Sequence, residues 1–174
     1  MLNQLECEVV KNHKVHGFAA YLQGAWFEFP KLESNISKRN YPIKKDITEI
    51  LDRMEGRQIS FDVEYAGLSR EAINPLKIEQ EAWKLLSPKV STYLEKFRQF
   101  LNSYSPEKVN DRSRGELLAL TQEGWNLLQK WNIISKSYSP KYEIAIYGQT
   151  GWTERDIQER EETVNVLVQN LSSQ

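Results

Sequence analysis

Two runs of apolar residues at helical spacing constrain the fold of this chain more than any other feature. In residues 87–104 the apolar side chains recur at steps of four and three, and in residues 113–134 at steps of three and four. This spacing places each set along one face of a helix. The residues are Val90, Leu94, Phe97, Leu101 and Tyr104 in the first run, and Leu117, Leu120, Gly124, Leu127, Trp131 and Ile134 in the second. A loop joins the two runs, so the sequence predicts an antiparallel helical hairpin.

Three other segments carry helix signals. Residues 45–56 show helical apolar spacing, and Gly56 is placed to end that helix. Residues 74–86 open with an asparagine and a proline, which is typical of a helix start. The same signal recurs at Pro88 and predicts that a separate helix begins there. A last helix is expected over residues 154–171.

Four segments alternate or run apolar in the manner of strands. They are residues 5–10, 18–29, 57–67 and 142–147. Residues 32–45 are polar, contain a proline and are predicted to form a loop. Together with the helices, these segments predict an α+β fold with a small antiparallel sheet, a helical lobe and a C-terminal helix.

The length and the lack of a linker predict one domain. The chain has 174 residues, enough to bury a core without disulfides or metal. We expect a single domain over residues 1–174, with residues 68–136 as the helical lobe.

Composition excludes several classes of protein. The net charge is -1, and no third of the chain is strongly basic, which argues against a freestanding nucleic-acid binder but not against a subunit of a larger assembly. Cys7 is the only cysteine, which fits a reducing compartment. No apolar run approaches the roughly 18 residues that span a bilayer, and the N-terminus lacks the pattern of a signal peptide. We therefore expect a cytoplasmic protein without membrane contact.

The stretch GQTG at residues 148–151 has the layout of a phosphate-binding loop, because it stands between a predicted strand and a helix. It lacks the lysine and the serine or threonine of a P-loop. Thr153 can cap the following helix, and Trp152 and Ile157 stand at the positions of a hydrophobic staple. We interpret the stretch as a structural corner. The alternative is that Trp152 is an exposed anchor for a partner.

Cys7, His13 and His16 are the only cysteine and histidine residues of the chain. They offer three zinc ligands without motif spacing, or a cysteine–histidine nucleophilic pair. A core cysteine and two solvated histidines fit the sequence better. We therefore predict no catalytic residue, no metal and no cofactor.

One loop is the best candidate for nucleic-acid contact. It groups cations around an aromatic residue, as backbone binding with base stacking requires. The residues are Lys38, Arg39, Tyr41, Lys44 and Lys45. The alternative is a solvated connector.

Three residues are candidates for protein contact. Trp125 lies off the apolar seam of its helix, so it faces a neighbouring element or an interface. Trp152 is the second candidate and Arg155 the third. Arg155 belongs to a helix with alternating charges, where pairs such as Asp156–Arg160 predict a solvated face or a contact surface.

The stretch IAIYGQTGWTERDIQER, residues 144–160, resembles part of the small accessory subunit of type III-D CRISPR effector complexes. The shared features are a tyrosine–glycine strand end, a tryptophan turn and a Glu/Arg-rich stretch. Ile146, Tyr147 and Gly148 stand where a Trp-Gly pair is more usual in that family. The resemblance implies a non-catalytic subunit of a guide-RNA assembly in antiviral defence, and it transfers no catalytic residue.

The leading hypothesis is therefore a non-enzymatic accessory or adaptor subunit of a multi-protein assembly, with a ribonucleoprotein of the CRISPR type as one setting. Its partners would be other protein subunits and RNA. The alternative is a standalone protein-binding regulator such as an inhibitor, chaperone or phage-defence factor. A third hypothesis is a small enzyme that uses Cys7, His13 and His16.

Overall fold

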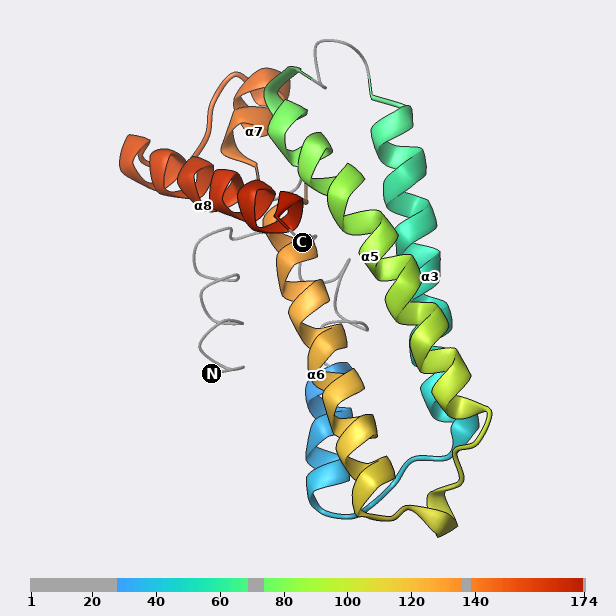
Figure 1. Ribbon diagram of the computed structural model, residues 1–174. Coiled ribbons are helices and arrows are strands. Elements are labelled where there is room, and N and C mark those ends of the chain that lie inside the picture. Colours follow the sequence, from blue (N-terminus) through green and yellow to red (C-terminus); the bar gives the residue numbers. More distant parts are fainter. Residues whose placement is uncertain (1–27, 69–73, 136–138, 174) are drawn as a thin grey trace.

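The computed structural model describes residues 28–68, 74–135 and 139–173, and the only regular secondary structure in this part of the chain is helical (Figure 1). The helices are residues 28–37, α3 (Lys44–Ala66), α5 (Lys77–Leu101), α6 (Asp111–Ile133), α7 (Pro140–Tyr147) and α8 (Glu154–Ser172), with short 3-10 turns at η1 (Asn74–Leu76) and η2 (Pro106–Lys108). The predicted α+β fold is therefore wrong, since these residues contain no strand. The strand predicted at residues 5–10, and nearly all of the one at 18–29, lie outside the described residues.

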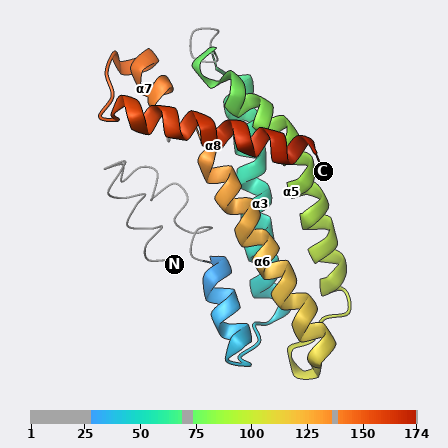
Figure 2. The same cartoon turned by 60° about the vertical axis from the view of Figure 1, so that its left-hand side comes forward.

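Four of the helices run up and down as an antiparallel bundle. They are residues 28–37, α3, α5 and α6, and α8 crosses the bundle at one end (Figure 1 and Figure 2). α5 is the central element, because it packs against α3, α6 and α8. α7 packs beside η1 at the same end as α8. The predicted hairpin is present as α5 and α6.

Residues 57–66 continue α3 and Gly67 is its C-cap, so residues 57–67 do not form the predicted strand. Met54, Gln58, Phe61 and Tyr65 are buried at steps of four, three and four, which is helical spacing. A polar residue, Gln58, occupies one of these core positions and hides the period. α3 continues past Gly56, which was expected to end this helix.

α5 is one helix where the sequence predicts two. Pro88 lies inside it, and the buried side chains of Leu86 and Val90 continue the core-facing stripe on both sides. The helix carries the proline because packing on both flanks compensates for the missing backbone hydrogen bond.

Two shorter segments also differ from prediction. Residues 28–37 are helical where the polar residues of 32–45 predict a loop, because Phe29, Leu32 and Ile36 are buried at helical spacing. The strand predicted at residues 142–147 is the helix α7, which Ser139 caps by accepting a hydrogen bond from the Tyr142 N–H.

The core is densely packed where three helices meet. Phe61, Trp83 and Trp131 join α3, α5 and α6, with ring centroids 4.9–5.3 Å apart. Elsewhere on α6, a Cβ added at Gly124 would overlap the Tyr93 hydroxyl and the Phe29 ring. Gly124 therefore allows α5 and the helix of residues 28–37 to approach α6.

Candidate functional site

The second residue after helical residues 28–37, Arg39, has an unusual backbone conformation. Arg39 is exposed and has a φ of 60°, the left-handed region that residues other than glycine rarely adopt. Its N–H donates to the Ile36 carbonyl at 3.0 Å, and the Asn40 N–H donates to the Asn35 carbonyl at 2.8 Å. This is a Schellman motif, in which glycine is the usual residue at this position. A cation thus occupies a position where glycine would be more stable.

Two lysines start α3, next to the loop that contains Arg39. Lys44 and Lys45 are both exposed, and the preceding Ile43 provides no side-chain cap for the helix. The first amide groups of α3 and its dipole add to the positive potential of the two lysines. Asp46 in the first turn offsets part of it.

A second loop, residues 102–110, lies at the same end of the bundle (Figure 1 and Figure 2). Tyr104 in this loop donates its hydroxyl to the Pro42 carbonyl oxygen at 2.6 Å. Burial raises the pKa of Tyr104 to about 12, so the hydroxyl keeps its proton and remains a donor. The hydrogen bond ties the two loops together and brings the exposed Lys108 to this end.

Two arginines of the first turns of α6 join the same end. Arg112 is exposed and pairs with Glu116 at 3.4 Å. Arg114 is partly buried, and its Nε atom is buried without a hydrogen-bond partner among the described residues.

We call this collection of side chains the basic end. It consists of Lys38, Arg39, Lys44, Lys45, Lys108, Arg112 and Arg114. Residues 38–46 carry four basic and one acidic side chain. Residues 102–116 carry three basic and three acidic, including Glu116, the partner of Arg112, so the two segments together have a net charge of +3. The structure thus places the four predicted cations together and adds three. No local sequence signal indicates those three, because the fold alone brings the second loop to the first.

Tyr41, the predicted stacking residue, is only partly available. Its ring is partly buried and packs against the hydrophobic core. A base could stack only on the part of the ring that remains exposed. Backbone contact by the cations is therefore the stronger chemistry of this surface.

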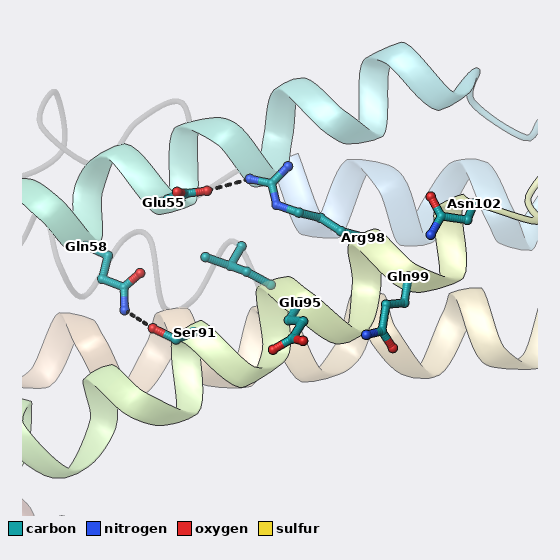
Figure 3. Close-up of a pocket in the computed structure, with 8 residues that line it drawn as sticks. Glu55, Gln58, Ser91, Glu95, Arg98, Gln99 and Asn102 are labelled. Carbon is teal, nitrogen blue, oxygen red and sulfur yellow. Dashed lines mark hydrogen bonds and ion pairs between the residues drawn. The ribbon is translucent and has the colours of Figure 1, made fainter.

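A groove of about 380 Å³ lies between α3 and α5 (Figure 3). Two polar bridges cross it: the Gln58 amide donates to the Ser91 hydroxyl at 2.7 Å, and Arg98 pairs with Glu55 at 2.6 Å. Arg98 also pairs with Asp52 at 3.0 Å. The polar side chains that cross the groove already pair with one another. Their main role is therefore to hold α3 and α5 together.

A buried ion pair joins α8 to α5. Glu79 Oε2 and Arg160 Nη1 are 3.5 Å apart, and their side chains are only 2% and 8% exposed. Arg160 also donates to the Ile133 carbonyl at 2.7 Å. Burial raises the pKa of Glu79 by more than the Arg160 charge lowers it. Arg160 therefore does not belong to the solvated face that the charge pattern of its helix predicts.

The pair lines a cavity of about 260 Å³ between η1, α7 and α8, which Pro75, Ile157 and Val164 also line. The Oε2 atom of Glu79 is buried without a hydrogen-bond partner among the described residues, so hydrogen bonds do not fully satisfy this carboxyl group.

The three residues predicted for protein contact lie on two elements. Trp125 lies on α6, partly buried against the core. Trp152 and Arg155 lie together at the start of α8, where Trp152 is partly exposed and Arg155 pairs with Glu159 at 3.1 Å. Thr153 caps this helix by accepting from the Asp156 N–H at 3.2 Å, as predicted. The staple partners Trp152 and Ile157 are both partly exposed.

Cys7, His13 and His16 lie outside the described residues, so the enzyme hypothesis that rests on them stays untested. Within residues 28–68, 74–135 and 139–173, no group of three or more His, Cys, Asp and Glu side chains could hold a metal ion.

Comparisons with protein families, with curated proteins and with solved structures find no match to this chain. In the part of the chain that the structure describes, no helix is both long and apolar enough to cross a membrane. The stretch that resembles the CRISPR accessory subunit does not end a strand here, because residues 140–147 are helical.

Proposed function

We propose that the protein is a non-enzymatic accessory subunit that holds a nucleic-acid backbone at its basic end. The observation that carries the proposal is the meeting, at one end of the bundle, of two segments that are distant in sequence, residues 38–46 and 102–116, whose side chains leave a net charge of +3. The hydrogen bond from Tyr104 to Pro42 ties these loops together. Repeated phosphates at a regular spacing are the ligand that such a cluster neutralises best.

The overall charge of the chain limits the affinity that the basic end can have for nucleic acid. The whole protein has a net charge of -1, so the positive potential is local. A few phosphate contacts give weak, salt-sensitive binding on their own. We therefore place the protein in an assembly, in which other subunits supply the remaining affinity and the sequence specificity. A reducing compartment such as the cytoplasm fits its single cysteine.

The direct test is binding of the full-length protein to a fluorescein-labelled single-stranded RNA, followed by anisotropy. The variant is Lys44→Gln/Lys45→Gln at the start of α3. The matched control is Lys77→Gln/Lys84→Gln in the first turns of α5, which makes the same charge change on exposed residues outside the basic end. The proposal predicts about a 5- to 10-fold loss for the first pair and less than about 2-fold for the second. Equal losses would show attraction by total charge and would contradict a site at the basic end.

A further inference from the structure

α7 exposes apolar side chains that the described residues 28–68, 74–135 and 139–173 leave uncovered. Ile144, Ile146 and Tyr147 are 42%, 47% and 74% exposed, and Pro140 is the only fully buried residue of this helix. Ile144 and Ile146 lie about 200° apart around a helix, so the apolar surface covers two sides of α7. These exposed side chains add little to the core, so folding does not explain why they are apolar. Exposed apolar patches of this kind often mark interaction sites.

The conformation of α7 and its following loop is fixed by local hydrogen bonds. Gly148 ends the helix with a φ of 76°, and its N–H donates to the Ile144 carbonyl at 2.8 Å. The Thr150 hydroxyl donates to Glu143 at 2.6 Å and folds the loop back on α7. A partner would therefore meet a surface that is already ordered, which lowers the entropic cost of binding.

The helix that follows α7 begins with an excess of acidic side chains. The first turns of α8 expose Glu154, Asp156, Glu159 and Glu162 against a single exposed cation, Arg155. Lys141 at the start of α7 pairs with Glu161 and is thereby neutralised. This pair also fixes α7 beside α8. The exposed charge of the corner is therefore negative, opposite in sign to that of the basic end.

We propose that α7 and the exposed face of the first turns of α8 form a docking surface for a segment of another protein that carries leucine-like side chains next to lysines and arginines. The apolar side chains of the segment would cover Ile144 and Tyr147, which lie about 60° apart around the helix, and its cations would face the carboxylates of α8. Tyr147 is the anchor of the proposed surface, since tyrosine is enriched among the few residues that dominate binding energy at interfaces. The carboxylates orient the segment and accelerate encounter. The same carboxylates repel nucleic acid, so this surface is separate from the basic end and does not depend on its role.

The test uses the full-length protein and two synthetic fluorescein-labelled peptides with the same heptad pattern, one of leucine and lysine and one of leucine and glutamate. The variant Ile144→Ser/Tyr147→Ser removes the exposed apolar surface. The matched control is Ile59→Ser/Val63→Ser on α3, where the side chains are 57% and 67% exposed. We expect the leucine–lysine peptide to bind the parent and the control alike, and the α7 variant at least about 10-fold more weakly. The glutamate peptide should not bind.

Three outcomes would overturn the proposal. Equal binding of both peptides would show attraction to apolar surface alone. Equal losses in the α7 variant and the α3 control would show that α7 is not the site. Sedimentation velocity on the parent without peptide gives the third: a concentration-dependent dimer that the α7 variant abolishes would identify a second copy of this chain as the occupant.

Discussion

The Tyr104 hydroxyl donates a hydrogen bond to the Pro42 carbonyl oxygen at 2.6 Å, across a sequence separation of 62 residues. This contact holds the loop before α3 against the loop before α6. The charges of the basic end are therefore arranged by a residue that carries no charge itself.

Replacing Tyr104 with phenylalanine tests this arrangement. We expect the unfolding free energy to fall by about 0.5–1.5 kcal/mol, because the Pro42 carbonyl loses its donor. RNA affinity should fall about 2- to 5-fold although no charge changes, since the loops separate more readily. Urea denaturation and RNA anisotropy on the same preparations measure both effects. Unchanged RNA affinity in the destabilised variant would show that the two loops act independently.

The variant Arg39→Gly should change the stability of the protein and its RNA affinity in opposite directions. Glycine adopts a φ of 60° without the cost that arginine bears, so the variant should be more stable by about 1 kcal/mol. The same change removes a cation from the basic end and should weaken RNA binding. Arg39→Asn is the control, because asparagine tolerates this conformation and also lacks the charge. A variant that is less stable than the parent would contradict the backbone conformation described here.

One substitution at two glycines should have opposite effects. Gly124→Ala places a methyl group against Tyr93 and Phe29, and we expect a loss of about 1–3 kcal/mol. Gly56→Ala lies on an exposed face of α3 with no atom within 4 Å of the new Cβ, and it should add up to about 1 kcal/mol. Urea denaturation measures both. A stable Gly124→Ala protein would refute the close approach of the three helices.

The buried carboxyl group of Glu79 makes stability depend on pH. Its folded pKa lies above the ordinary value, so the folded state holds this proton more tightly than the unfolded state does. The contribution of Glu79 to stability is therefore largest at low pH and is lost as the pH rises through the folded pKa. We expect the unfolding free energy of the parent, relative to Glu79→Gln, to increase as the pH falls from about 7 to about 5. A flat or opposite difference would contradict the burial of this group.

The hairpin of α5 and α6 could be predicted because its seams are long, apolar and regular. The strand predicted at residues 57–67 was wrong because Gln58 fills a core position, while Ile59 and Val63 are exposed and imitate an alternating pattern. The helix α7 was wrongly predicted to be a strand for a related reason, since the apolar side chains that suggested the strand are exposed on a helix.

For the candidate sites too, residues that are close in sequence could be predicted together, and residues that only the tertiary fold brings together could not. The cations from Lys38 to Lys45 are visible as a local cluster in the sequence. Lys108, Arg112 and Arg114 join them only through the tertiary fold. Arg160 appears in the sequence as one charge of a solvated helix, yet it pairs with Glu79 across the fold. Pairing of this kind leaves no periodic signal.

The most direct test of the central claim is the salt dependence of RNA binding. The logarithm of the binding constant falls with the logarithm of salt concentration, with a slope of about -0.7 for each phosphate neutralised on a single strand. The quadruple variant Lys38→Gln/Arg39→Gln/Lys44→Gln/Lys45→Gln should therefore have a slope shallower than that of the parent by about 2 to 3. The same slope in both proteins would show that these cations do not contact the backbone, and it would contradict the proposed function.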